Sequence, residues 1–412
     1  MKKRYKWIGL SILGLCAVGL SGLILRTKFV LALPMINYNH LLEGHGHFTF
    51  CGWLSLALMT LMVDQLLPPS FSNKSIYQWL LGFITISSWA MLFAFSVEGY
   101  SLVGSILFIL FILTTYVFSW TFVRDILKSR PNKPVLLFAI SSLVCLVLSS
   151  AGPLIITYMS FTKSFDAIVY RNALFTYLHL QYNGFFTLAV FALLFNDGRF
   201  AMNAKATHKI YRFAILICSS IIPSLFLSYL WQDPGLLVRL VAVAGSLLVL
   251  LALFFFLFCT SFIKNIFARE KRVIKFLMIL SMCSFVLKML LQGFTIIPQI
   301  GNAIFGNRPI VMGFLHLVFL GFISLFILAF YTAKGFISGS RSFPIAALAI
   351  FAFGIIVNEA LLIVQGLTAM FGTGSMVFPW LLWCAGVWLF AGTVLVAGAH
   401  FITKESKKPD YF

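Results

Sequence analysis

Long apolar stretches, separated by short polar connections, alternate along the whole chain. Each stretch is close to the ~20 residues that an α-helix needs to cross the hydrocarbon core of a bilayer. They run near residues 7–25, 45–66, 77–97, 101–123, 134–158, 174–195, 211–231, 236–262, 274–296, 310–332, 344–366 and 376–400. The pattern predicts an all-α, polytopic membrane protein with about twelve transmembrane helices, forming one transmembrane domain over residues 1–412.

Composition supports this prediction and suggests an orientation. The chain is 61% hydrophobic and 10% charged, whereas a soluble domain carries roughly 25% charged residues. With the N-terminus inside, most Lys and Arg fall in cytoplasmic segments, for example at residues 2–6 and 124–133. We therefore expect a bacterial-type inner (plasma) membrane location with both termini in the cytoplasm. The formal net charge of +19 then reflects topology and contact with anionic lipid headgroups of the bilayer, and predicts no nucleic-acid partner.

Three segments of the chain align without gaps. They cover residues 47–56, 179–188 and 316–325, and share His, four residues, Gly, an aromatic residue, an apolar residue, Ser or Thr, and Leu. Successive copies lie four predicted helices apart, on predicted helices 2, 6 and 10, so they cross the membrane in the same direction. The spacing predicts three parallel four-helix repeats, at approximately 7–123, 134–262 and 274–400.

The repeated histidines suggest a cofactor site. His47, His179 and His316 each lie in the first two turns of a helix that runs inward, within roughly 10 Å of the outer interface at 1.5 Å rise per residue. Ionisable residues inside a bilayer are costly and are functional candidates. Imidazole suits haem iron, copper or zinc, so we expect His47 and His316 to hold a haem, with His179 and His45 as further metal-ligand candidates. The alternative is that each is a hydrogen-bonded packing residue.

Other polar residues accompany these histidines. Glu43 lies four residues before His47 and could orient its imidazole, whereas His45 and His47 point to nearly opposite sides of a regular helix. Lys288 and Glu359 lie toward the outer ends of their helices, where they could pair with each other. A polar belt could also line a solute path, formed by Glu43, His47, Glu98, His179, Lys288, His316 and Glu359.

Twelve helices in three parallel repeats, with histidines on helices 2, 6 and 10 near the outer face, resemble the catalytic subunit (subunit I) of the haem-copper oxidases and nitric oxide reductases. The resemblance implies a b-type haem between His47 and His316, and a first copper or non-haem-iron ligand at His179, in a segment that includes Asn183. Arg308 and Arg171 precede helices 10 and 6, where they could meet haem propionates or act as interfacial anchors. The motif His45-Gly-His47 is also similar to one that opens a membrane helix in another twelve-helix family, linked to nitric oxide stress.

The sequence departs from the oxidase pattern at the second metal site. The family has an adjacent histidine pair on helix 7, but residues 221–231 contain no histidine, and Phe314 stands where the high-spin haem ligand would be. The resemblance therefore implies a degenerate relative without a complete binuclear centre and without standard oxygen or nitric oxide reduction.

We expect a membrane haem protein that acts in electron transfer or in a response to diatomic gases or redox state. Its partners would be an electron donor or other respiratory subunits. A copper or other metal site at His179 is possible, but its ligand set would be incomplete. The alternatives are a transporter or metal-handling permease with a histidine-lined site, and a cofactor-free assembly subunit.

Overall fold

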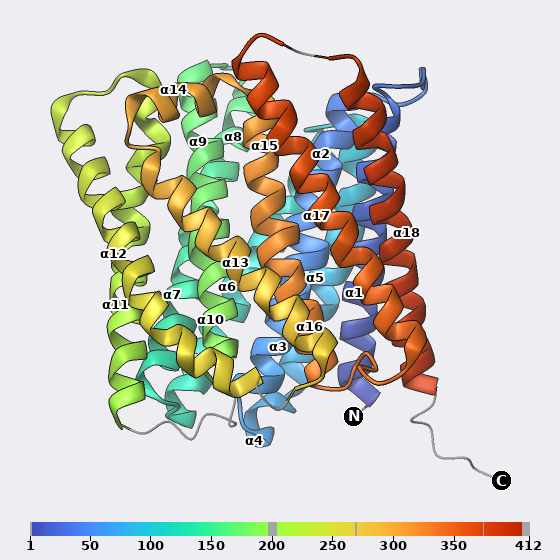
Figure 1. The fold of residues 1–412 in the computed structure, drawn as a ribbon, viewed down its shortest axis with the longest axis vertical. Coiled ribbons are helices and arrows are strands. Elements are labelled where there is room, and N and C mark those ends of the chain that lie inside the picture. The colour runs from blue at the N-terminus through green and yellow to red at the C-terminus, as the bar shows by residue number, and fades with distance from the viewer. Residues whose placement is uncertain (1, 197–203, 268–269, 374, 406–412) are drawn as a thin grey trace.

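A computed structural model describes residues 2–196, 204–267, 270–373 and 375–405. Within these ranges the chain is helical, has no strand, and contains twelve helices long and apolar enough to cross a membrane. Figure 1 shows them as one bundle of roughly aligned helices. The predicted all-α fold with twelve spans is confirmed. The second span begins at Tyr38, earlier than expected, which places Glu43 and His45 inside it.

The spans are built from continuous and composite helices. The continuous ones are α1 (Lys2–Thr27), α5 (Ser75–Glu98), α6 (Leu102–Ser129), α12 (Leu236–Phe267), α13 (Arg272–Phe294), α17 (Ser342–Met370) and α18 (Val377–Glu405). Three composite spans have three parts each: α2 (Tyr38–Phe48), η1 (Thr49–Ser55) and α3 (Leu56–Leu66); α9 (Ala167–His179), η2 (Leu180–Phe186) and α10 (Thr187–Phe195); and α15 (Arg308–His316), η4 (Leu317–Ser324) and α16 (Leu325–Ala333). Two more have two parts each: α7 (Lys133–Ser149) with α8 (Ala151–Thr162), and α11 (Ala204–Leu225) with η3 (Phe226–Gln232). Short helices α4 (Pro69–Ser72) and α14 (Pro298–Gly306) lie in connections.

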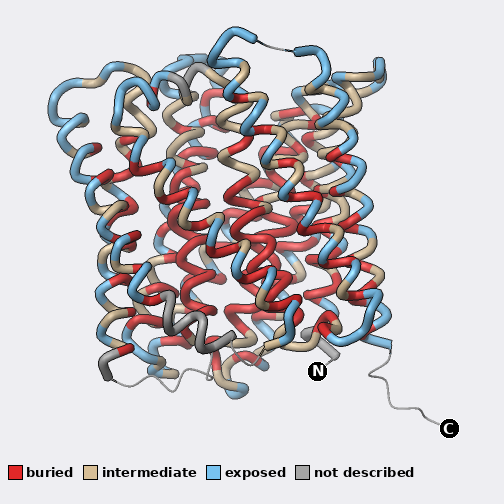
Figure 2. The backbone as a smooth tube through the Cα atoms, viewed as in Figure 1, coloured by how far each residue is buried: buried red, intermediate tan, exposed pale blue. Residues whose placement is uncertain are grey.

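The three composite helices that carry the histidine motif have buried middles. Figure 2 shows buried residues concentrated in the middle of the bundle and exposed ones on its outer helices. Each motif helix contains a π-helical segment (η1, η2 or η4), which starts one or two residues after the motif histidine. Single-turn π segments are uncommon and are frequent at functional sites. The sequence repeat is thus also a repeat of local backbone geometry.

The motif glycine explains part of this repeat. A Cβ added at Gly184 would lie 2.3 Å from Cβ of Cys145, and one at Gly321 would lie 2.8 Å from Oγ of Ser284. In the first repeat, the oxygen of Gly52 lies 2.6 Å from a Cβ added at Gly14. In the second and third copies the motif glycine therefore meets the preceding span at a distance that admits no larger side chain, as small residues do between membrane helices. In the first copy it is Gly14 of the preceding span that has no room for a side chain against the Gly52 backbone, whereas a Cβ on Gly52 itself would meet the Phe48 ring of the same span.

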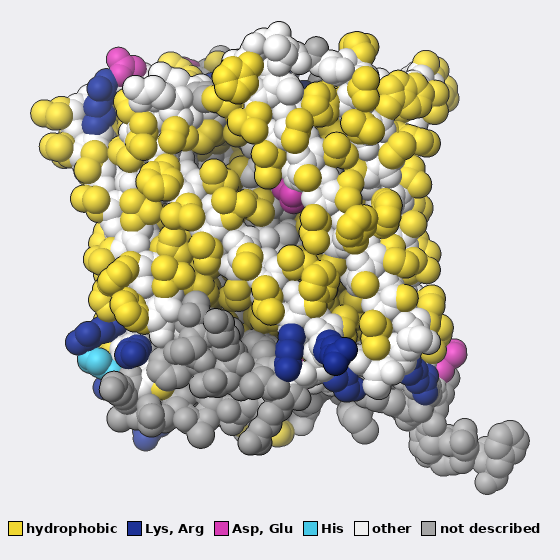
Figure 3. Space-filling model, viewed as in Figure 1, with side chains coloured by type: hydrophobic (Ala, Val, Ile, Leu, Met, Phe, Trp, Pro, Cys, Tyr) yellow, Lys and Arg dark blue, Asp and Glu magenta, His cyan; other side chains and the backbone are white. Residues whose placement is uncertain are grey.

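The ends of the bundle differ from its middle. Figure 3 shows a broad hydrophobic face, with Lys and Arg side chains along the lower end. Helix α1 begins and α18 ends at that end (Figure 1). There Asp125 is fully buried and accepts hydrogen bonds from Nζ of Lys74 at 2.6 Å and from the Tyr77 hydroxyl at 2.9 Å, which ties α5 to α6. The hydrophobic face is what a lipid-facing surface requires.

Candidate functional site

His45 lies on α2 with its ring turned toward α1. Its Nδ1 is 2.9 Å from Oγ of Ser21, whose own proton goes to the carbonyls of Ala17 and Val18. The serine oxygen can then only accept, so Nδ1 of His45 carries the proton and Nε2 keeps its lone pair. A Cβ added at Gly22 would lie 3.2 Å from Cε1 of His45, so a glycine is what lets this ring approach α1 closely.

His316, the last residue of α15, has the same tautomer. Its Nδ1 is 2.7 Å from the carbonyl oxygen of Met312, which can only accept a hydrogen bond. The lone pair is therefore again on Nε2, and no hydrogen-bond partner to Nε2 is found for His316 or His45 among the described residues. A histidine that donates Nδ1–H to a backbone or side-chain oxygen and leaves Nε2 free has the arrangement of a metal ligand. Both side chains are half-buried, and the two interact electrostatically.

Open space lies beside Gly46, the residue that follows His45. A Cβ added at Gly46 would meet no atom within 4 Å. Phe50, four residues further along the same helix, packs on Phe319 with ring centroids 4.9 Å apart. Gly46 precedes Phe50 by four residues and His316 precedes Phe319 by three, so Gly46 and His316 each lie about one helical turn above this contact.

Arg26 of α1 links five spans beside this space. Its guanidinium donates to the carbonyl of Leu382 at 2.7 Å and to Oδ1 of Asn358 at 2.5 Å. The amide of Asn358 in turn donates to Glu359 at 2.9 Å. Arg26 interacts electrostatically with His45, His316 and Glu359. A fixed cation therefore lies near both imidazoles, and a carboxyl group lies near that cation.

His47 faces away from this group. Its ring stacks on Phe95 at 4.5 Å and meets the edge of Phe108 at 4.5 Å, and its Nε2 is 2.9 Å from the Tyr100 hydroxyl. These partners belong to α5, to α6 and to the turn between them. The structure therefore does not bring His47 next to His316, as the sequence had led us to expect. Residues 45 and 47 lie on opposite sides of α2, and His45 is the one turned toward Arg26 and His316.

Glu43 lies on the same side as His47, as its spacing predicted. It interacts electrostatically with Tyr100 and His40 and makes no recorded contact with His47. Its Oε2 and Nδ1 of His47 are both buried without a hydrogen-bond partner.

His179 has both ring nitrogens engaged. Nε2 donates to the carbonyl of Ile221 at 2.9 Å, and Nδ1 accepts from the side-chain amide of Asn183 at 3.1 Å. The carbonyl of Asn183 accepts a hydrogen bond from Nζ of Lys288. The Nδ1 lone pair of His179, which a metal would need, is thus used in a hydrogen bond within the protein. The Lys288 amine lies at the far end of this series of hydrogen bonds. Among the described residues, no group of three or more His, Cys, Asp or Glu side chains could hold a metal ion.

The remaining predicted residues lie at the rim. Arg308 is exposed and donates to the Tyr38 hydroxyl at 2.8 Å. The guanidinium of Arg171 lies over the ring of Trp231, 4.1 Å from its centroid, which joins α9 to η3. Phe314 packs edge-to-face on Tyr182 at 5.6 Å, so aromatic rings stand between His316 and His179.

The predicted polar belt is divided among three places. Glu43 and His47 lie against α5 and α6, His179 and Lys288 against α11 and α13, and His316 and Glu359 beside α1 and α17, with Glu98 exposed at the end of α5. Lys288 and Glu359 consequently do not pair. Sequence reasoning missed Arg26; the available signal was an arginine at the outer end of a span, against the inward bias of basic residues.

The arrangement of the spans is that of haem-copper oxidase subunit I. A haem-copper terminal oxidase dimer solved by electron cryo-microscopy superposes with a TM-score of 0.73, covering 99% of this chain and 85% of that chain at 12% sequence identity. At this identity the likeness shows the fold alone. No protein-family profile matches the sequence, and no curated protein matches it either.

Proposed function

We propose that the protein is an integral membrane haem protein of haem-copper oxidase type, in which His45 and His316 hold one b-type haem. The observation that carries this is the matched state of the two imidazoles. Both donate Nδ1–H to a protein oxygen, and neither Nε2 has a hydrogen-bond partner among the described residues. The open space beside Gly46, next to His45 in the chain, is where we place the haem. The structural neighbour, a haem-copper oxidase by its description, supports the choice of haem.

The residues around the space fit such a group. Two neutral imidazoles are the donor set of a low-spin haem. Arg26 supplies a cation next to both rings, which suits the carboxylates of haem propionates. At the rim, Arg308 beside Tyr38 could play the same role, whereas Arg171 is stacked on Trp231 and is better explained as an anchor.

Electron transfer is the activity that this ligand set favours. When bound, a haem with two protein ligands supplies a one-electron carrier and has no open position for a gas. The chain's own residues hold the two rings in place through Ser21 and the Met312 carbonyl, and exclude water below them with Phe50 and Phe319. An electron donor or other respiratory subunits are the partners that this activity requires.

The protein is further proposed to lack a complete binuclear centre. His179 uses both ring nitrogens internally, and Phe314 packs on Tyr182 in the place of a second haem ligand. A permease with one polar path is not favoured, because the belt residues are spread over three separate clusters.

We also propose a bacterial-type inner-membrane location with the basic end of the bundle in the cytoplasm. The support is the bias of Lys and Arg toward the end where α1 begins and α18 ends (Figure 3). Reporter fusions or thiol labelling at the two ends would test it. Labelling of the basic end from outside intact cells would contradict it.

The haem proposal is tested by absorption spectra of detergent-purified protein, oxidised and reduced, with a pyridine haemochrome assay of haem per chain. We expect sharp reduced α and β bands that are lost in His45→Ala and in His316→Ala, and are kept in the matched control His47→Ala. Size-exclusion profiles would confirm that all three variants fold. Loss in His47→Ala with retention in His45→Ala would overturn the ligand assignment, and colourless wild-type protein made with ample haem would favour a cofactor-free assembly subunit.

A further inference from the structure

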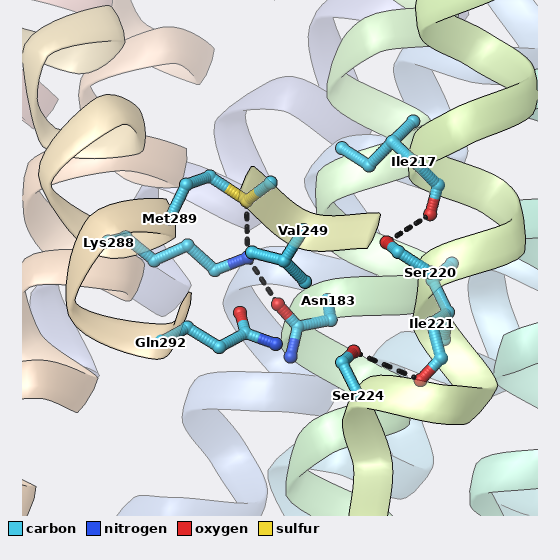
Figure 4. Close-up of a pocket in the computed structure, with 9 residues that line it drawn as sticks. All are labelled: Asn183, Ile217, Ser220, Ile221, Ser224, Val249, Lys288, Met289 and Gln292. Carbon is cyan, nitrogen blue, oxygen red and sulfur yellow. Dashed lines mark hydrogen bonds between the residues drawn. The ribbon is translucent and has the colours of Figure 1, made fainter. Parts of the chain in front are cut away.

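A second polar site lies between α9–η2, α11, α12 and α13, on the far side of the Tyr182 and Phe314 rings from His316. Figure 4 shows it as a small cavity with the Lys288 ammonium at one wall and the α11 serines at the other. Its volume is about 10 Å³, close to the space that one water molecule occupies. It is lined by Asn183, Ile217, Ser220, Ile221, Ser224, Val249, Lys288, Met289 and Gln292.

The ammonium of Lys288 is buried and has no counter-charge in its surroundings. The side chain is 1% exposed. Its partners are the carbonyl of Asn183 and the sulfur of Met289 at 3.6 Å, with the rings of Tyr182 and Phe285 5.9 Å away. An ammonium has three N–H donors and a thioether sulfur is a weak acceptor, so two of the three have no strong partner.

The sequence of the surrounding spans shows that the protein cannot supply the missing charge. Residues 167–195, 206–232, 236–259 and 272–294 contain no Asp or Glu. A buried charge without a partner is costly in a membrane interior, where ionisable groups normally pair. Either the amine is neutral in the folded protein or a bound anion supplies the missing charge.

Further groups at the cavity can donate to such an ion. Gln292 is 7% exposed, and its Oε1 is buried with no hydrogen-bond partner. Its NH₂ group points toward Asn183 and the cavity, as Figure 4 shows, and can donate to an ion there. The Ser224 hydroxyl donates to the Ile221 carbonyl over a long 3.3 Å and can rotate toward the ion.

We propose that this cavity binds one small monovalent anion, of the size of chloride, between Lys288, Gln292 and Ser224. A cavity the size of one water molecule leaves room, after small side-chain movements, only for a monatomic ion, and is too small for polyatomic anions such as sulfate or gluconate. The site lies six residues, or about 9 Å at 1.5 Å per residue, from the outer end of α13, so the ion would enter from the outer side. The binding does not depend on the haem proposal.

The test uses the full chain in detergent and chloride as the probe. Thermal unfolding is followed by tryptophan fluorescence while sodium chloride replaces sodium gluconate at constant ionic strength, and equilibrium dialysis with radiolabelled chloride gives the stoichiometry. We expect a saturable rise in Tm and one chloride per chain for wild type and for Lys133→Gln, a matched exposed lysine. The same response is expected of the haem-ligand variant His316→Ala.

Two variants make the result decisive. Lys288→Met keeps a long flexible side chain, removes the unpaired charge and should abolish both the chloride-dependent shift and the bound chloride. Gln292→Leu keeps the ammonium and should weaken chloride binding by about tenfold, the equivalent of one hydrogen bond. No saturable difference between chloride and gluconate in wild type, or an unchanged response in Lys288→Met, would overturn the proposal and leave a neutral amine beside a water molecule.

Discussion

The motif glycine of the second repeat allows a quantitative test of how the bundle is packed. In Gly184→Ala, the new Cβ would stand 2.3 Å from Cβ and 2.7 Å from Sγ of Cys145. Carbon atoms in contact are ~3.5–4.0 Å apart, so η2 and α7 must separate by more than an ångström. Because a Cβ cannot rotate out of the way, we expect a destabilisation of about 1–3 kcal/mol, the usual cost of overpacking.

The assay is reversible unfolding in mixed micelles with increasing denaturing detergent, followed by tryptophan fluorescence. Cys145→Gly should restore most of the loss, since it removes both clashing atoms, and the double-mutant cycle should give a coupling of about 0.5–3 kcal/mol. Gly46→Ala serves as the matched control in another motif helix. Its Cβ meets nothing within 4 Å, so the fold should be unaffected or slightly more stable.

A wild-type unfolding curve for Gly184→Ala would refute this reasoning. So would additive effects of the two substitutions at 184 and 145, because additivity means that the two residues are not in contact in the native state. In either case, close contact with the preceding span would not be the reason for a glycine at position 184.

Three further predictions concern the bundle and its sites. Gly46→Leu should lower the haem content per chain without lowering Tm, because it fills the space between the two imidazoles; unchanged haem content would place the haem elsewhere. Asp125→Asn should cost ~1.5–3 kcal/mol in the same unfolding assay, since it removes charge-assisted hydrogen bonds from Lys74, and should have no effect on haem. Trp53→Phe should lower the free energy of unfolding by about 1 kcal/mol, because it removes the 2.9 Å hydrogen bond from the Trp53 indole to the Ser324 hydroxyl. If Ser324→Ala lowers it by the same amount, the shared hydrogen bond accounts for both losses.

The fold was predictable because membrane insertion leaves a strong mark on the sequence. Runs of apolar residues fixed the number of spans, and the predicted limits lie within a few residues of the observed ones at most ends. The repeat was visible because the motif glycine has no room for a side chain in any copy: Gly184 and Gly321 face the preceding span, and Gly52 faces Phe48 of its own span. The start of the second span was predicted too late, because Tyr38 and Asn39 are polar residues that α2 includes after its Asn37 cap.

The ligand pair was harder to predict for a geometric reason. His45 and His47 are separated by one glycine, and sequence alone does not say which side of the helix faces α15. That choice depends on packing: Phe95 and Phe108 enclose His47, whereas Ser21 on another span fixes the tautomer of His45. The role of Arg26 depends in the same way on contacts with two distant spans, through Asn358 and Leu382.

The three equivalent histidines show how one repeated scaffold can hold three different chemical environments. His47 is enclosed by aromatic rings, His179 is held by two hydrogen bonds, and only His316 presents a free Nε2 to open space. The ammonium of Lys288 lies in the cluster of the second histidine, where the resemblance to oxidases would imply a metal cation. A fixed cation there opposes binding of a second one and favours an anion. We therefore expect the cluster around His179 to bind an anion and not a metal ion. Because this cluster is separate from His45 and His316, haem content and chloride binding should respond to different variants.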